Sequence, residues 1–315
     1  MKRLIILFLF LFFISTNSYS QAIINSCDSY TWSANGNTYT QSGTYSANTT
    51  INDYSMSFGG SGSGNIVSFN NQVIPSNGSF TISFWALPNS SSGIQEFMHQ
   101  NSWVSPGNAF YIGMNGTQIR CGDTWQSTSA NVIINKWQYI SVVRHYNSHV
   151  DIYIDGILMA SKSSDITISS ANDNLRFGCQ YSGASVENYN GYLDAVEIWN
   201  FPLSSQQVMD YMNCSPTGNE TGLLGFWNFE QGNGVTALDL SGNGNNGTIT
   251  GAIYDNNTIS GFSCTETLNL TINPSTTSTA NVTECDTYSW NGTTYTATGT
   301  YTYNTTNSVG CDSTA

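Results

Sequence analysis

Residues 137–156, with the sequence WQYISVVRHYNSHVDIYIDG, are the stretch that decides the fold class. The segments 137–143 and 150–154 each show the alternation or short apolar run of a β-strand and are rich in Val, Ile and Tyr. Asp155 and Gly156 follow the second segment, and Asp-Gly is a strong hairpin-turn signal. This stretch therefore predicts consecutive antiparallel strands.

Strand signals of the same kind continue on both sides of this stretch. They cover residues 78–85, 110–114, 175–179 and 194–199, and turn signals such as Asn115-Gly116 separate them. Only residues 203–212 read as a helix, with Ser204 or Ser205 as the N-cap. Many short strands with frequent turns predict an all-β fold, a two-sheet antiparallel jelly-roll sandwich.

Composition excludes several classes of protein. The 315 residues are 9% charged and 13% aromatic, with 29 Gly, and the formal net charge is −13. Coiled coils and helical bundles need more charged helix formers, and a nucleic-acid binder needs a basic surface. We therefore expect no nucleic-acid partner.

The N-terminus has the features of a secretory signal peptide. Lys2 and Arg3 precede an apolar run from Leu4 to Ile14, and small residues lead to a cleavage site near Ser20. The run is too short to span a bilayer as a helix. We expect a protein that is secreted or at the cell surface, with no membrane insertion in the mature form.

The two ends of the chain carry copies of one repeat. Residues 27–32, CDSYTW, align with residues 285–290, CDTYSW, and the similarity continues through two further Tyr-containing segments. The first copy is interrupted, which predicts a domain inserted into it. The expected divisions are 1–20 signal peptide, 21–50 first half of repeat one, 51–260 inserted jelly roll, 261–273 end of repeat one, 274–281 linker, and 282–315 repeat two, truncated.

The chain has seven cysteines, and in an exported protein cysteines are expected to form disulfides. A repeat of this size has little core, so a disulfide should staple each one. We expect Cys285 to pair with Cys311 and, by analogy, Cys27 with Cys264. Cys121 and Cys179 both close apolar strands and could pair, which leaves Cys214 unpaired unless its partner is Cys264.

The inserted domain resembles the laminin G-like jelly rolls of the concanavalin A-like lectin and glucanase superfamily. The resemblance rests on FTISFW at 80–85, VDIYIDG at 150–156, GYLDAVEIW at 191–199 and GFWNFE at 225–230. The GFWNFE block usually opens such a domain but closes this one. The flanking repeats resemble Thr- and Tyr-rich modules of bacterial surface proteins.

The resemblance implies a sandwich that binds glycans or proteins, often with calcium, while some relatives are glycoside hydrolases. Hydrolases of this superfamily carry closely spaced acids on one strand, and that string does not occur in this sequence. Asp151 and Asp155 are the nearest pair, but Asp155 suits the hairpin turn, and Asp194 and Glu197 should face opposite ways. We therefore expect no enzyme activity.

Two other groups of polar residues are candidate metal ligands. Asp239, Ser241 and Asn243 have the spacing of the first half of a calcium loop, and Asp194 could join Asp239 and Asn243 in a jelly-roll calcium site. The alternative is a tight turn whose side chains bond their own backbone. His145 and His149 are four residues apart between two strands, where this spacing predicts a loop with two surface histidines rather than zinc.

Aromatic side chains in polar loops are the candidate sugar-stacking residues. Trp103, Trp125, Tyr181 and Tyr189 lie in such loops, whereas Trp85, Trp137, Trp199 and Trp227 lie in apolar strand patterns and should be core. The leading hypothesis is a non-catalytic recognition or adhesion module that binds a glycan or an extracellular protein, with calcium as the expected cofactor. The alternatives are a structural spacer in a surface stalk and a glycoside hydrolase.

Overall fold

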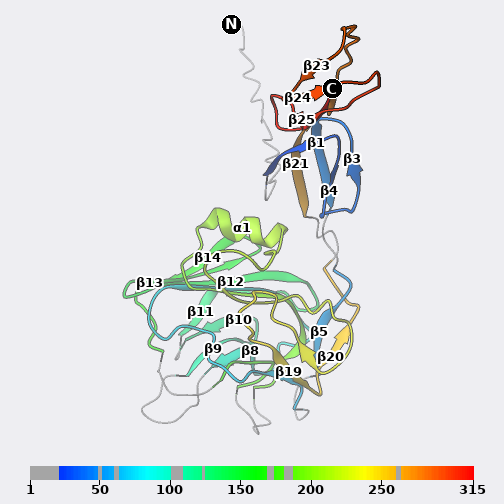
Figure 1. Ribbon diagram of the computed structural model, residues 1–315. Coiled ribbons are helices and arrows are strands. Elements are labelled where there is room, and N and C mark those ends of the chain that lie inside the picture. The colour runs from blue at the N-terminus through cyan, green and yellow to red at the C-terminus, as the bar shows by residue number, and fades with distance from the viewer. Residues whose placement is uncertain are drawn as a thin grey trace, which may run out of the picture. The chain divides into compact units, whose positions relative to one another are not determined.

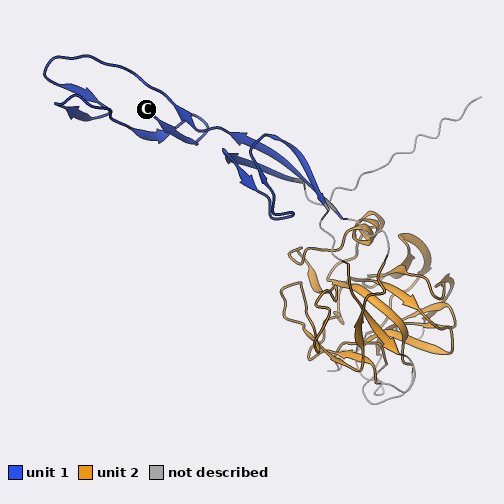
Figure 2. Ribbon diagram, turned by 90° about the vertical axis from the view of Figure 1, so that its right-hand side faces the viewer, with its two compact units in different colours: residues 1–49, 264–315 blue, residues 50–263 orange. Residues whose placement is uncertain are grey.

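The computed structural model describes residues 21–48, 52–59, 64–100, 109–122, 125–168, 174–180, 187–259 and 264–315. The chain divides into two compact units, residues 1–49 with 264–315 and residues 50–263 (Figures 1 and 2). The expected signal peptide lies outside the described residues. None of the described helices is long and apolar enough to cross a membrane.

Residues 50–263 form the predicted all-β sandwich of two mostly antiparallel sheets (Figure 1). One sheet, the β7 sheet, has the order β14-β13-β12-β7-β16-β5-β20, with β17 also paired to β16. Its strands are β5 (Ser55–Gly59), β7 (Phe80–Pro88), β12 (Gln138–His145), β13 (His149–Ile154), β14 (Ile157–Lys162), β16 (Asn190–Trp199), β17 (Leu223–Trp227) and β20 (Ile253–Asp255).

The second sheet, the β8 sheet, has the order β11-β10-β9-β8-β15-β6-β19-β18. Its strands are β6 (Ile66–Ser68), β8 (Ile94–Gln100), β9 (Phe110–Asn115), β10 (Gln118–Cys121), β11 (Trp125–Asn131), β15 (Arg176–Phe177), β18 (Thr236–Ala237) and β19 (Gly247–Thr250). The late strands β17 and β19 thus pair inside the sandwich with β16 and β6.

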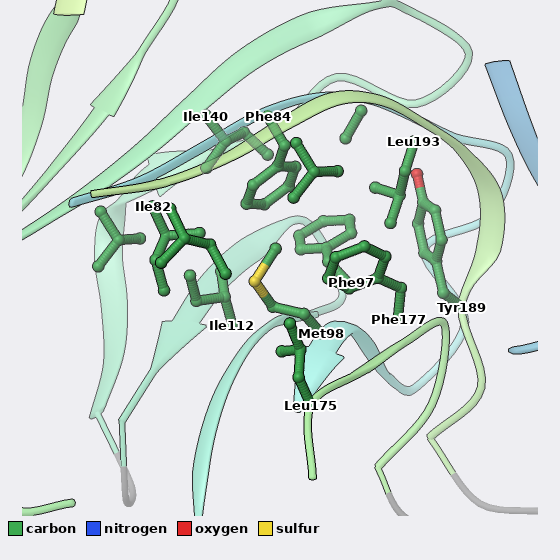
Figure 3. Close-up of a cluster of buried hydrophobic side chains, with 14 of the residues drawn as sticks. Ile82, Phe84, Phe97, Met98, Ile112, Ile140, Leu175, Phe177, Tyr189 and Leu193 are labelled. Carbon is green, nitrogen blue, oxygen red and sulfur yellow. The ribbon is translucent and has the colours of Figure 1, made fainter. Parts of the chain in front are cut away.

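The core lies between the two sheets and consists of one continuous apolar cluster. In most strands alternate residues point inward, and a bulge in β8 turns both Phe97 and Met98 inward, so both sheets contribute aliphatic and aromatic side chains (Figure 3). The residues labelled there are Ile82, Phe84, Phe97, Met98, Ile112, Ile140, Leu175, Phe177, Tyr189 and Leu193, and all of them are buried. Because these side chains come from strands of both sheets, the core fixes which face of each strand is turned outward.

The helix α1 (Ser205–Asn213) confirms the helix expected from sequence. Ser204 is its N-cap and forms a capping box with Gln207. The buried residues of α1 are Val208 and Tyr211, and the Tyr211 ring packs 4.5 Å from that of Trp199 on β16. Trp199 is not part of the core between the sheets, so α1 covers the outer face of the β7 sheet.

The other unit contains both repeats. In the first, β1 (Gln21–Cys27), β21 (Thr265–Asn273) and β4 (Gly43–Asn48) form one sheet, and β2 (Tyr30–Thr31) pairs with β3 (Thr38–Tyr39). In the second, β22 (Thr276–Thr277), β26 (Asp312–Thr314) and β25 (Asn304–Thr306) form a sheet, and β23 (Tyr288–Trp290) pairs with β24 (Thr293–Tyr295).

The two repeats share details of packing as well as strand order. The rings of Tyr39 and Tyr45 lie 3.9 Å apart, and the equivalent rings of Tyr295 and Tyr301 lie 4.0 Å apart. In each copy the second tyrosine hydroxyl donates to the backbone carbonyl four residues earlier. The sequence similarity therefore corresponds to one repeated local structure.

The disulfide bonding differs from the expected pattern. Cys27 is bonded to Cys311, so it joins the start of repeat one to the end of repeat two. Cys214 and Cys264 are also disulfide-bonded, so Cys214 is not the cysteine left over. The expected pairs Cys27–Cys264 and Cys285–Cys311 are both wrong because each assumed that a repeat is closed within itself.

Three cysteines are thiols. Cys285 is exposed and not disulfide-bonded. Cys121 and Cys179 are buried thiols rather than the two halves of the expected disulfide, and burial raises the pKa of Cys179 to about 11. These two residues therefore act as small core side chains.

Candidate functional site

A group of polar side chains lies on the outer face of the β8 sheet. On β9, Ile112 and Met114 point into the core, so the alternation of the strand turns Tyr111 and Gly113 to the opposite face. Arg120 of β10 lies directly across from Gly113. We use the name β8–β10 polar cluster for Glu96, His99, Tyr111, Arg120, Glu187 and Asn188.

The charged groups of this cluster contact one another. Oε2 of Glu96 lies 2.9 Å from Nδ1 of His99, and neither side chain is exposed. Arg120 donates a 3.2 Å hydrogen bond to the Tyr111 hydroxyl, and its guanidinium also lies over the Tyr111 ring. A second Arg120 nitrogen lies 3.8 Å from a carboxyl oxygen of Glu187.

Local backbone geometry makes room for this arrangement. A Cβ on Gly113 would lie 2.4 Å from the carbonyl oxygen of Gln95 and 3.2 Å from Cγ of Glu96, so only glycine fits beside the Glu96 side chain. Glu187 has a positive φ of 60°, and its carbonyl accepts a hydrogen bond from the Glu96 backbone N–H. Backbone strain at a non-glycine residue tends to occur at functional sites.

The two carboxyl groups affect each other's ionisation. Burial raises the pKa of Glu96 to about 7, against the opposing effects of Glu187 and Arg120. Burial also raises the pKa of Glu187 to about 7, and the neighbouring Glu96 adds to the increase. The pair therefore shares protons near neutral pH and titrates as a unit.

Several buried polar atoms of the cluster have no hydrogen-bond partner among the described residues. They are Oε1 of Glu96, Nη1 of Arg120, Oε2 of Glu187, and both amide atoms of Asn188. A buried donor or acceptor without a partner costs about 1–3 kcal/mol, and native proteins contain few of them. Nη1 of Arg120 and Oε2 of Glu187 form the 3.8 Å ion pair described above, and the Glu96 carboxyl interacts with that of Glu187. Among these groups, only the Asn188 amide has neither kind of contact with the described residues.

Two of the four expected stacking aromatics are described, and both are placed differently from the prediction. The prediction that Tyr189 exposes its ring is wrong, because its side chain is fully buried in the core and its hydroxyl donates to the Tyr192 carbonyl. Trp125 begins β11 rather than lying in a loop, and its half-buried ring packs against the core. Trp103 and Tyr181 lie outside the described residues.

Two tryptophans expected in the core lie elsewhere. Trp199 and Trp227 are buried as predicted, but Trp85 and Trp137 are only half-buried. The Trp137 ring packs 6.1 Å from that of Tyr192, and its indole N–H donates to the Asn257 side chain. The sequence pattern missed this because outward-facing aromatics also occupy strand positions.

The side chains of the predicted calcium ligands Asp239 and Asn243 form hydrogen bonds within the protein. Oδ1 of Asp239 accepts hydrogen bonds from the backbone N–H groups of Phe226 and Ser241 and from the Ser241 hydroxyl, and Oδ2 accepts from the backbone of Asn245. The Asn243 amide donates to the Leu223 and Leu224 carbonyls. The tight-turn alternative describes Asp239, which bonds Ser241 and Asn245 within the turn. Asn243 instead bonds two carbonyls of β17.

Asp194 has other neighbours. It is buried, it accepts a hydrogen bond from the Ala195 backbone, and its remaining oxygen has no hydrogen-bond partner among the described residues. Burial raises its pKa well above the ordinary range, and the charge of Glu230 adds to the increase. The structure thus brings Asp194 near Glu230, and calcium binding stays a prediction.

The remaining acids weighed for hydrolysis have structural roles. Asp155 occupies the hairpin turn with a φ of 51° and accepts from the Tyr139 backbone N–H, as its turn position predicted. Glu197 is fully buried beside Tyr139 and Trp199. The expectation that Asp194 and Glu197 face opposite ways is wrong, because a bulge between them places Asp194 across from Trp85 and Glu197 across from Ser83, on one face of the sheet. The pair that does meet, Glu96 and Glu187, was missed because the two residues are far apart in sequence. The available signal was an acid next to Phe97 and Met98 in the segment 94–100.

The comparisons with known proteins agree with this architecture. No curated protein matches the sequence. A proposed carbohydrate-binding protein from Bacteroides ovatus has a similar structure, with a TM-score of 0.52, 16% identity, and coverage of 67% of this chain and 61% of that one. This chain therefore matches less than two thirds of that protein's length.

Two further structures are similar at a lower level. The pentraxin of Limulus polyphemus that resembles serum amyloid P has a TM-score of 0.46 and 13% identity, over 67% of this chain and 95% of that one. A sialidase carbohydrate-binding module of Ruminococcus gnavus has a TM-score of 0.37 and 12% identity, over 42% of this chain and 82% of that one. Residues 59–209 match a family model, Laminin_G_3, that is described as the concanavalin A-like lectin/glucanases superfamily.

Proposed function

We propose that this protein is a non-catalytic carbohydrate-binding module and that the β8–β10 polar cluster contacts the glycan. The observation that carries the proposal is the gathering of Glu96, Arg120, Glu187 and Asn188 on one sheet face, with buried polar atoms that make no hydrogen bond of ordinary length to the described residues. Sugar hydroxyls both donate and accept, so they can satisfy carboxylate, guanidinium and amide groups together. The similarity of the fold to a proposed carbohydrate-binding protein supports the same reading.

The charge of the cluster favours an uncharged glycan. Two carboxyl groups lie beside the Arg120 guanidinium, one nitrogen of which donates to the Tyr111 hydroxyl, and Arg176 lies directly across from His99 on the neighbouring strand, so acids and bases nearly balance. An acidic sugar would meet the two carboxyls directly, whereas neutral hydroxyls would meet a partly protonated pair. The proposed ligand is therefore a neutral oligosaccharide.

Binding of the full chain to an array of neutral and acidic glycans tests this proposal. Glu187→Gln and Arg120→Gln should each weaken binding by about tenfold or more, because each removes a hydrogen bond to a charged group. Asp210→Asn on α1 changes the charge equally at a residue outside the cluster and serves as the control. Unchanged affinity in both cluster variants, with normal thermal unfolding, would contradict the proposal.

An extracellular location and a role in adhesion form part of the proposal. The chain contains disulfides, which persist in oxidising compartments. We propose calcium as the cofactor and test it by repeating the array with calcium and with EDTA. Glycan affinity that does not fall on chelation would contradict this part of the proposal. Binding to extracellular proteins is measured with the same cluster variants, Glu187→Gln and Arg120→Gln.

A glycoside hydrolase is the second candidate, and the meeting of Glu96 and Glu187 is the observation in its favour. Glycosidase carboxyls are about 5–5.5 Å or about 6.5–9.5 Å apart, so that they flank the sugar bond. Glu96 is instead fully buried against His99 and interacts directly with Glu187, which suits binding better. Release of reducing sugar by the wild-type protein but not by Glu187→Gln would favour hydrolysis.

A further inference from the structure

The hairpin of β12 and β13 brings together two histidines and an aspartate. In its register His145 lies directly across from His149, and Val143 lies across from Asp151. Asn147 adopts a φ of 57° in the connecting turn, which the Ser148 N–H closes by donating to the His145 carbonyl. The hairpin register thus places His145 and His149 side by side, which their four-residue spacing alone did not predict.

All three side chains occupy the outer face of the β7 sheet. Val150 and Ile152 belong to the core, so the alternation of β13 turns His149 and Asp151 outward. Directly opposed residues of an antiparallel pair share a face, which puts His145 on the same side. The three residues therefore converge without any distortion of the strands.

The distances among the three groups are close to those of a metal site. Nε2 of His145 lies 3.8 Å and Nε2 of His149 lies 3.5 Å from the same Asp151 carboxyl oxygen. One ligand atom from each residue lies within 4.8 Å of the other two. Ligands bonded to a tetrahedral zinc at about 2.1 Å are about 3.4 Å apart, so small side-chain rotations would complete the geometry.

The local contacts bring both ring nitrogens near Asp151, and the stacked rings must turn out of parallel before both Nε2 lone pairs, which lie in the ring planes, can meet one ion. The two imidazoles are stacked with centroids 4.1 Å apart and planes inclined by 12°. Ser148 Oγ lies 2.8 Å from Nδ1 of His149, which leaves Nε2 of that ring facing Asp151. The separations from Asp151 are longer than good hydrogen bonds, so these groups lie close together without satisfying one another.

The neighbouring cations are engaged elsewhere. Arg144 forms a bidentate pair with Asp165, and Lys162 contacts Ser164 and the Asp165 carbonyl. About one third of each histidine side chain is exposed, against 12% for Asp151. An ion can therefore reach the site from solvent and keep a coordination position open on that side.

We propose that His145, His149 and Asp151 bind one divalent transition-metal ion, zinc in the first instance, through two imidazole nitrogens and one carboxylate oxygen. Imidazole and carboxylate are ligands suited to Zn²⁺, and three protein ligands leave a fourth position for water or a ligand atom. The site joins the two strands of the hairpin and lies on the sheet opposite the β8–β10 polar cluster. It does not depend on the proposed glycan function.

Zinc titration of the full chain by calorimetry tests the proposal. The protein is freed of metal, carries no polyhistidine tag, and has Cys285→Ser so that the exposed thiol does not bind zinc. We expect one zinc ion per chain and a visible spectrum of tetrahedral type when cobalt replaces zinc. His149→Ala and Asp151→Asn should each weaken zinc binding by more than about a hundredfold, and Ser148→Ala by about tenfold.

The controls separate loss of the site from loss of the fold. Tyr146→Phe alters the same turn but none of the ligands and should bind zinc normally. Zinc should raise the midpoint of thermal unfolding in wild type and Tyr146→Phe but not in the ligand variants. Normal zinc affinity in both His149→Ala and Asp151→Asn, or no saturable uptake by wild type at about 1 mM free zinc, would overturn the proposal.

Discussion

Glu96→Gln should remove a large part of the pH dependence of stability. Burial holds the Glu96 side chain inside the β8–β10 polar cluster and raises its pKa to about 7 from an ordinary 4.5. The folded protein therefore keeps a proton that the unfolded chain loses as the pH rises between these values. Glu96 contributes stability that is fully present below about pH 4.5 and is lost as the pH rises through about 7.

The size of the effect follows from that shift. Moving the pKa of one carboxyl from 4.5 to about 7 corresponds to about 3 kcal/mol, at 1.36 kcal/mol per pH unit. No reduction for solvent screening is needed for Glu96, since its side chain is not exposed. Glutamine has the same shape and carries no ionisable proton, so the variant should lack this loss of stability.

Urea unfolding at a series of pH values from 4 to 8 measures the effect. The free energy of unfolding changes by about 2.303RT per pH unit for each proton by which the folded and unfolded states differ. Relative to wild type, Glu96→Gln should gain up to about 3 kcal/mol between the two ends of the series. Because the two carboxyls titrate as a unit, this gain includes the loss of the increase that Glu96 causes in the pKa of Glu187. Glu284→Gln removes an exposed carboxyl in repeat two and should leave the profile unchanged. Parallel pH profiles for Glu96→Gln and wild type would refute the reasoning.

Three further changes test other parts of the structure. Phe97→Ala should destabilise the sandwich by about 3–5 kcal/mol in urea unfolding, because it leaves a cavity in the core; a loss below about 1 kcal/mol would contradict the packing. Asp239→Ala should lower the stability by about 1–3 kcal/mol, since the turn loses a hydrogen-bond acceptor. EDTA should not shift the unfolding midpoint of either protein; a shift seen only in wild type would instead indicate a bound metal. Cys27→Ser should lower the stability of the repeat unit by about 2–5 kcal/mol and leave Cys311 as a thiol that maleimide labels once the chain is unfolded without reductant; an unlabelled Cys311 peptide would show a different pairing.

The local features of the fold could be predicted from sequence because they depend on neighbouring residues. The strand alternation at 150–154, the Asp155 turn and the Ser204 cap of α1 are all present in the structure. The internal repeat was also visible, and its two copies share the same tyrosine packing. Short-range periodicity and turn chemistry carry this information.

The candidate sites could not be predicted because they combine residues from separate strands. Glu96 meets Glu187 only because the segment before β16 runs beside β8. Tyr189, in the same segment, looked like a loop aromatic but turns into the core. Whether a ring at a strand end points inward depends on packing that neighbouring residues do not reveal.

The amino-acid pattern alone established an all-β sandwich with one short helix, carried between copies of a small repeat. Only the tertiary structure decided which acids share protons, that His145 and His149 face Asp151, and that Cys27 bonds Cys311 across two repeats. The physical reason is that alternation along a strand is a property of consecutive residues. Partners across strands depend on register and sheet order, which the whole core selects together.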